Sequence, residues 1–223
     1  MGEILALGLL RAGWEPEDLA LAARRPERAR ETEFHTGIST TLDPAEASAG
    51  KRVVVVAVKP KDVPNLLDQI RDAIAPDQVL VSFAAGVTTA AFERELPGIA
   101  VVRSMPNTPA AMDEGMTAYC GGSEADEAAL ADAAAVLGAV GETIRLSEDL
   151  LDAVRTGRIS LWAATRILAP LARANAEHAR TLLAQLEQQP LSTRELGRLY
   201  EQYRQASKVQ RRRLVENPAL FVQ

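Results

Sequence analysis

The sequence predicts an α/β protein in which a doubly wound parallel sheet is followed by an all-α helical tail. Up to about residue 146, short apolar runs alternate with helical patterns, and the short connections between them are typical of parallel sheets. After about residue 155 no strand pattern follows. The charge reverses at the same place, because residues 1–154 hold 13 Lys and Arg against 25 Asp and Glu, whereas residues 155–223 hold 12 against 5. We therefore expect two domains, 1–154 and 155–223.

Six apolar runs of strand length are expected to form the sheet. Four consecutive valines at 53–56 disfavour a helix, and their apolarity on both faces predicts burial inside a parallel sheet. The predicted strands span 19–24, 53–58, 79–86, 99–106, 116–120 and 142–146. Helical spacing predicts helices at 3–13, 62–74, 89–96 and 125–138. A further helix is expected to begin at Asp43, with Pro44 in its first turn and Glu46 completing a capping box.

Residues 155–223 show only helix signals. Amphipathic spacing predicts helices at 160–169 and 176–187. Ser192 and Glu195 form a capping box that opens a third helix to about residue 206, and a basic stretch, Lys208–Arg213, follows it. This excess of basic residues is suited to binding nucleic acid or another acidic surface. The alternative interpretation is that it attracts the acidic first part of the chain.

The composition argues against several classes of protein. The single cysteine, Cys120, excludes an internal disulfide framework, and we expect it to be a buried apolar residue rather than a nucleophile. His35 and His178 have no metal-ligand spacing, so no metal site is expected. There is no basic-then-apolar leader, and no apolar run approaches the ~20 residues that span a bilayer. We therefore expect a cytoplasmic protein that does not contact a membrane.

Parallel sheets bind ligands at the carboxyl ends of their strands, so the segments that follow the strands form the candidate site. These segments are AARRPER, AVKPKD, AAGVTT and SMPNTPA. Arg24 and Arg25 follow the run at 19–24, where a dinucleotide fold places the adenosine ribose, and arginine there accommodates the extra phosphate of NADP. A solvated basic turn is the alternative interpretation.

The other three segments offer backbone and amide groups. Lys59 faces either a phosphate or solvent, and Pro60 fixes the chain where a ring could stack. Gly86 permits the backbone to approach a ligand closely. Two prolines stiffen the loop around Asn107 and Thr108, whose polar groups suit an amide-bearing ring such as nicotinamide. Taken singly, the segments at Lys59 and Gly86 are explained better by turn chemistry than by a binding site.

Together these motifs resemble pyrroline-5-carboxylate reductase. In chain order they are LLRAGW, AARRPERA, VVVVAVKPKDV, VSFAAGVTTA, VVRSMPNTPA, EGMTA and LGAVGE, and AVKP combined with RxMPNTPA is the most specific. The resemblance covers residues 1–154 and implies a Rossmann-like domain that binds NADPH or NADH. It also implies hydride transfer to the imine carbon of 1-pyrroline-5-carboxylate, which yields L-proline in the last step of proline biosynthesis.

The resemblance implies cofactor-binding residues but identifies no catalytic residue. Arg24 and Arg25 would lie near the adenosine ribose or its phosphate, and the others along the cofactor and its nicotinamide pocket. The implied set is Gly2, Arg24, Arg25, Ala57, Val58, Lys59, Pro60, Ala84, Ala85, Gly86, Met105, Pro106 and Asn107. In such an enzyme the cofactor supplies the hydride, while the protein supplies orientation and electrostatics.

Two departures from that family predict an impaired enzyme. The family opens with a strand and a glycine-rich turn, of which only Gly2 has a counterpart here, so we expect the first strand to be missing and two strand edges to be exposed. After LLDAV the family continues into a Ser-Gly-Ser-Gly-Pro helix start and the helices that bind substrate and build its homo-oligomer. Here the sequence reads RTGRISLWAATRI, so those dimer-forming helices are expected to be absent.

Residues 155–223 resemble ParB/KorB-like partition proteins between GRIS and LSTREL. This second resemblance implies weak DNA contact through Arg211, Arg212 and Arg213, and a solvated helix face is the alternative. We expect a seam near residues 154–155, produced by recombination or by a sequence-assembly error. Besides a reductase, two hypotheses therefore stay open: a DNA-associated, partition-like protein and a nonfunctional chimeric fragment.

Overall fold

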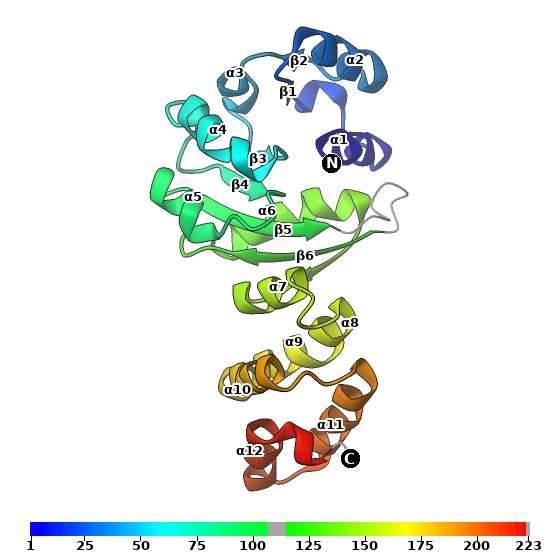
Figure 1. Ribbon diagram of the computed structural model, residues 1–223. Helices are drawn as coiled ribbons and strands as arrows, with labels where there is room; N and C mark the ends of the chain where they lie inside the picture. The colour runs from blue at the N-terminus through cyan, green and yellow to red at the C-terminus, as the bar shows by residue number, and fades with distance from the viewer. Residues whose placement is uncertain (107–114, 222–223) are drawn as a thin grey trace. The chain divides into compact units, whose positions relative to one another are not determined.

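The valine-rich runs form the first three strands of a five-stranded sheet in the order β3-β4-β5-β6-β7, with β3 at one edge of the described sheet (Figure 1). The strands are β3 (Val53–Val56), β4 (Val79–Ser82), β5 (Ala100–Pro106), β6 (Gly115–Gly121) and β7 (Gly141–Arg145). β3, β4 and β5 are parallel, but β6 runs antiparallel to β5. The prediction of an all-parallel sheet is therefore wrong at β6. Only residues 107–114 join β5 to β6, and a parallel crossover needs about a dozen residues or more.

The structure is a computed structural model that describes residues 1–106 and 115–221. The chain divides into two units, Met1–Arg145 and Leu146–Gln223. This division falls before the predicted seam near residues 154–155. The seam concerns how the sequence arose, and it stays a prediction.

A second, two-stranded sheet lies in the first unit, where β1 (Leu21–Ala22) pairs in parallel with β2 (Thr40–Thr41). Within the described residues, β1 pairs only with β2 and β3 pairs only with β4. Val53, Val54 and Val55 of β3 are half-buried, whereas Val56 is buried. Full burial of this strand was therefore a wrong prediction, because one edge of β3 has no strand beside it. That a first strand is missing from the fold stays a prediction.

Helices cover both faces of the main sheet, as a doubly wound fold requires. On one face, α4 (Val63–Ile70) and α5 (Thr89–Glu95) pack against Val56, Leu80 and Val101. On the other face, Val79, Val81 and Val102 pack against α6, and Val53 and Val55 pack against α1. Besides α4 and α5, the helices of this unit are α1 (Gly2–Arg11), η1 (Pro16–Asp18), α2 (Pro26–Thr36), α3 (Pro44–Ser48), η2 (Pro60–Asp62), α6 (Glu127–Leu137) and η4 (Gly138–Val140).

The start of α3 differs in one detail from its prediction. The Asp43 side chain accepts a hydrogen bond from the backbone N–H of Ala45, as a helix cap should. Glu46, however, accepts from the hydroxyl of Thr41, and the backbone N–H of Asp43 donates to that same hydroxyl at 3.1 Å. The expected capping box is therefore replaced by a network that includes the end of β2.

The second unit contains helices alone among its described residues, which agrees with the predicted helical tail. Its elements are α7 (Glu148–Arg155), α8 (Leu161–Ala163), η5 (Ala164–Leu168), α9 (Ala169–Ala174), α10 (Ala176–Gln188), α11 (Thr193–Gln205), α12 (Lys208–Glu216) and η6 (Pro218–Phe221). The predicted capping box of Ser192 and Glu195 is confirmed at the start of α11. η5 is a π-helical turn, and Pro170 follows it, which removes one backbone donor from the continuing helix.

The described residues contain no helix with the length and apolar character needed to cross a bilayer. Nor do they contain a group of three or more His, Cys, Asp or Glu side chains suited to a metal ion. Cys120 is 1% exposed in β6, which confirms its prediction as a buried residue. The cytoplasmic location stays a prediction.

Candidate functional site

The carboxyl ends of β3, β4 and β5 form one row. Val56 pairs with Ser82, Ser82 pairs with Arg103, and the backbone N–H of Phe83 donates to the carbonyl oxygen of Val56 at 2.9 Å. Three of the four predicted segments therefore lie side by side at this edge. Two of them leave the sheet, at Ala57 and after Phe83, whereas the third begins at Ser104 and continues along β5 to Pro106, paired with β6.

Two serines fix the exits of β4 and β5. The Ser104 hydroxyl donates to the carbonyl oxygen of Ser82 at 3.0 Å, and the Ser82 hydroxyl accepts from the backbone N–H of Ala84 at 3.1 Å. All three residues are buried. Neither serine was among the predicted site residues, because both lie inside the predicted strands 79–86 and 99–106.

The segment after β4 presents backbone to solvent. Gly86 has a φ of 79°, a left-handed conformation that favours glycine. Ala85 and Gly86 are exposed, but Ala84 is 2% exposed and packs in the core. Of these three predicted residues, Ala85 and Gly86 are thus accessible to a ligand, whereas Ala84 belongs to the hydrophobic core.

The first turn of α1 meets the end of β3. A β-carbon on Gly2 would lie 3.2 Å from the β-carbon of Ala57, which is itself exposed. The absence of a side chain at Gly2 therefore lets the helix N-terminus approach this strand end. Backbone N–H groups at a helix N-terminus attract anions. In this way the fold brings the predicted residues Gly2 and Ala57 together.

Arg24 and Arg25 lie between β1 and α2, and both are exposed. Arg25 is the N-cap residue of α2, and no side chain caps that helix. Nη1 of Arg24 lies 3.0 Å from Oδ2 of Asp62, which belongs to the turn after β3. This ion pair brings the segment after β1 to the segment after β3. Sequence reasoning missed Asp62, whose only signal was its place two residues after Pro60.

The other predicted residues near these strand ends differ in exposure. Lys59 and Pro60 are exposed at the start of η2, and Val58 is half-buried. Met105 and Pro106 are half-buried at the end of β5. Asn107 and Thr108 lie outside the described residues, so their predicted role is not addressed by the structure.

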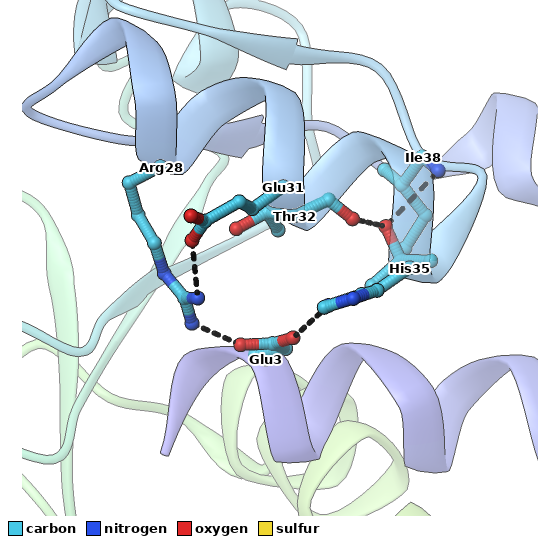
Figure 2. A network of polar contacts seen from close by, with 7 residues as sticks. Glu3, Arg28, Glu31, Thr32, His35 and Ile38 are labelled. Atoms are coloured by element: carbon cyan, nitrogen blue, oxygen red, sulfur yellow. Dashed lines mark hydrogen bonds and ion pairs between the residues drawn. The ribbon is translucent and has the colours of Figure 1, made fainter.

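A polar network joins α1 to α2 beside this site (Figure 2). Glu3, in the first turn of α1, pairs with Arg28 and lies with Oε1 3.6 Å from Nδ1 of His35. Arg28 also donates to Glu31 at 3.3 Å. Arg28 is therefore engaged by carboxylates, in contrast to Arg25. Glu3 and His35 were not expected to meet, because the residues are far apart in the sequence.

The basic stretch of the second unit is partly engaged by its own unit. Arg211 donates to the carbonyl oxygens of Tyr203 and Arg204, both at 3.0 Å. Arg212 donates to Glu216 at 2.7 Å, and Arg213 is exposed. These contacts are those of a helix cap and a helix-surface ion pair. The resemblance to partition proteins and the weak DNA contact stay predictions.

A family model described as "NADP oxidoreductase coenzyme F420-dependent" matches residues 1–86. Pyrroline-5-carboxylate reductase of Mycobacterium tuberculosis (strain ATCC 25618 / H37Rv) is 39% identical over 161 residues, which cover 69% of this chain and 54% of the relative. Pyrroline-5-carboxylate reductase 1 of Bacillus subtilis (strain 168) is 33% identical over 155 residues, with coverages of 68% and 52%. The chain thus spans about half the length of these curated relatives.

Solved structures show the same fold. A pyrroline-5-carboxylate reductase from Coxiella burnetii matches with a TM-score of 0.66 and 25% identity, covering 96% of this chain and 80% of that one. The Plasmodium falciparum pyrroline carboxylate reductase with NADP bound matches with a TM-score of 0.62 and 20% identity, covering 95% and 78%. At such coverage both matches extend into the helices after Leu146.

Proposed function

We propose that this chain is an NAD(P)H-dependent oxidoreductase of the pyrroline-5-carboxylate reductase family. The observation that carries the proposal is the single row formed by the exits of β3, β4 and β5. This row places AVKP beside AAG and SMP, the segments on which the resemblance rests. The proposed reaction is the reduction of 1-pyrroline-5-carboxylate to L-proline.

The residues at this row fit a dinucleotide cofactor, NADPH or NADH. Gly2 has no side chain where α1 approaches Ala57, and Ala85 and Gly86 present exposed backbone. Two exposed arginines, Arg24 and Arg25, stand where a phosphate-bearing ribose would lie. A long anionic ligand requires small residues where it passes close to the protein backbone. It also requires cationic side chains at the end where its phosphate lies.

Each group of residues has a separate task in this proposal. The cofactor, when bound, supplies the hydride for the imine. Arg24 and Arg25 bind its adenosine end, while the N–H groups at the start of α1 attract its phosphates. Met105 and Pro106, half-buried at the end of β5, exclude water from the nicotinamide end and limit its orientations. No side chain of the chain is assigned a proton-transfer step.

We further propose that turnover by this chain is low. The sequence after LLDAV departs from the Ser-Gly-Ser-Gly-Pro helix start that the resemblance would require. On this proposal, the motif by which that family's substrate-binding and dimer-forming residues would be identified is not found in the sequence after LLDAV. Cofactor binding is therefore expected to be easier to detect than substrate reduction.

The test measures dinucleotide binding and NADPH oxidation in the presence of 1-pyrroline-5-carboxylate. The purified full chain is expected to bind NADPH or NADH, and the Arg24→Ala/Arg25→Ala double variant is expected to bind NADPH about tenfold more weakly, a loss typical of charge-assisted hydrogen bonds. Arg30→Ala is the matched control, because Arg30 is an exposed arginine on α2 that pairs with Glu27. If the wild-type chain binds neither dinucleotide, the proposed function is wrong.

A further inference from the structure

We propose that Asp62 sets the preference of this site between NADPH and NADH by holding Arg24 and partly neutralising its charge. This inference rests on the proposed function, and in it Asp62 acts on the ligand through Arg24. Asp62 is therefore a positioning residue rather than a catalytic residue.

The backbone around Asp62 directs its side chain to Arg24. Asp62 ends the 3₁₀ turn η2, where its N–H donates to the carbonyl oxygen of Lys59 at 2.9 Å. It is also the N-cap residue of α4, but its side chain does not cap that helix. An aspartate at an N-cap normally accepts a backbone hydrogen bond there. Here the carboxylate faces Arg24 instead, at an Nη1–Oδ2 distance of 3.0 Å.

The contact is an ion pair without a hydrogen bond. Oδ2 of Asp62 is buried, and within the described residues no hydrogen bond reaches it. The guanidinium N–H groups of Arg24 are therefore not aligned with this oxygen and stay able to bind a second acceptor. Attraction between the charges is what holds the pair, so the carboxylate offsets the field that Arg24 presents to a ligand.

The two side chains differ in access. The side chain of Arg24 is 70% exposed and that of Asp62 is 22% exposed. Arg24 is thus the more accessible of the two to a ligand from solvent, and the negative charge of Asp62 lies 3.0 Å from its guanidinium. Arg25, which also lies at the start of α2, is exposed as well.

The consequence depends on the charge of the ligand's ribose. A phosphate monoester on the ribose is attracted by Arg24 and Arg25 but repelled by Asp62. An unphosphorylated ribose carries no negative charge of its own, so Asp62 does not repel it. Asp62 therefore shifts the balance toward NADH, compared with the same site lacking this carboxylate.

The experiment measures dissociation constants for NADPH and NADH by the fluorescence of the reduced nicotinamide. Asp62→Asn retains the size of the side chain and removes its charge, and it is expected to shift the affinity ratio toward NADPH about fivefold, the effect of one unit charge about 4 Å away when water screens the pair fully. Asp62→Glu keeps the charge and should keep a ratio near that of the wild type. Asp68→Asn is the matched control, because Asp68 is on α4 and pairs with Arg71 at 3.1 Å.

The measured affinity ratios support or overturn the inference as follows. An Asp62→Asn ratio that is unchanged, or that shifts toward NADH, overturns the inference. Equal weakening of both dinucleotides would assign Asp62 a merely structural role and would also overturn it. Should the wild type bind neither dinucleotide, the proposed function fails and the inference fails with it. Binding by the wild type with no shift in Asp62→Asn rejects the inference alone.

Discussion

Gly8 of α1 packs against Val140 so closely that a β-carbon on Gly8 would lie 2.5 Å from Cγ1 of Val140. The same β-carbon would lie 2.8 Å from the carbonyl oxygen of Ala139. Around this contact, Leu5 and Leu9 form one apolar cluster with Val136 and Val140. Glycine inside a helix costs about 1 kcal/mol relative to alanine, and the close approach to η4 explains its place here.

Gly8→Ala is expected to lower the free energy of unfolding by about 2 kcal/mol, because the added methyl group must displace a side chain and backbone that are already packed. Chemical denaturation of both proteins measures the difference. Gly138→Ala is the control, since a β-carbon there would meet no atom within 4 Å and its φ is −65°. That variant should be as stable as the wild type. Equal stability of the two variants would contradict the close packing of α1.

Ser192→Ala is expected to destabilise the second unit by about 1 kcal/mol through the loss of a helix cap. The Ser192 side chain accepts from the backbone N–H of Glu195, and the Glu195 side chain accepts from the backbone N–H of Ser192 at 2.8 Å. Thermal unfolding followed by circular dichroism measures the loss. Ser192→Asn, which retains a capping group, should stay close to the wild type. An unchanged melting temperature in Ser192→Ala would mean that the hydroxyl does not stabilise α11 as a cap.

Glu195 should make stability depend on pH in the acid range. The hydrogen bond from the Ser192 hydroxyl, followed by the one from the Ser192 backbone, lowers the pKa of Glu195 below its ordinary value of 4.5. A lowered pKa in the folded state means that the stabilisation is present above pH 4.5 and is lost as the pH falls through the folded-state pKa. The difference in melting temperature between the wild type and Glu195→Gln should therefore be larger at neutral pH than near pH 3. A difference that does not change with pH would exclude this linkage.

Tyr203 should make stability depend on pH in the alkaline range. Burial raises the pKa of Tyr203 above 10.0, although the charge of Arg211 opposes the rise. Its hydroxyl lies 2.7 Å from Nδ1 of His178, which joins α11 to α10. A raised pKa in the folded state means that stability is complete below pH 10 and is lost as the pH rises through the folded-state pKa. Titrating phenolate absorbance in the wild type and in Tyr203→Phe measures this, and a Tyr203 that ionises at its ordinary pKa would contradict it.

Much of the fold could be predicted from local patterns. The valine runs at 53–56 and 79–81 marked β3 and β4, because β-branched residues that are apolar on both faces suit the interior of a sheet. The signature of Ser192 and Glu195 predicted the start of α11 correctly, since a capping box depends only on residues three apart. Such features involve neighbours in the sequence, so no knowledge of the tertiary structure was needed.

The errors concern contacts between distant segments. The direction of β6 depends on the length of the connection after β5, which apolarity does not reveal. The partial exposure of Val53–Val55 depends on which strands lie beside β3. β2 was missed because it contains two threonines only, and α2 was missed because its few apolar residues give little periodicity.

The candidate site, like the fold, was predicted in part from the sequence. The sequence indicated which strand ends hold candidate residues, and the register confirms that the ends of β3, β4 and β5 lie together. It did not reveal Asp62, because an ion pair with Arg24 joins segments far apart in the chain. The binding roles of the predicted residues stay predictions until a dinucleotide is tested.

The two sides of β3 should exchange amide hydrogens with heavy water at very different rates. In a parallel strand, successive N–H groups point alternately to the two neighbouring positions, and the described residues supply a neighbour, β4, on one side of β3 only. β4 lies between β3 and β5, so its N–H groups meet a strand on both sides. Alternate amides of Val53–Val56 should therefore be labelled early, while those of Val79–Ser82 are labelled only on larger openings of the first unit. An isotope-labelling time course would thus map which edge of the sheet is open in solution, residue by residue.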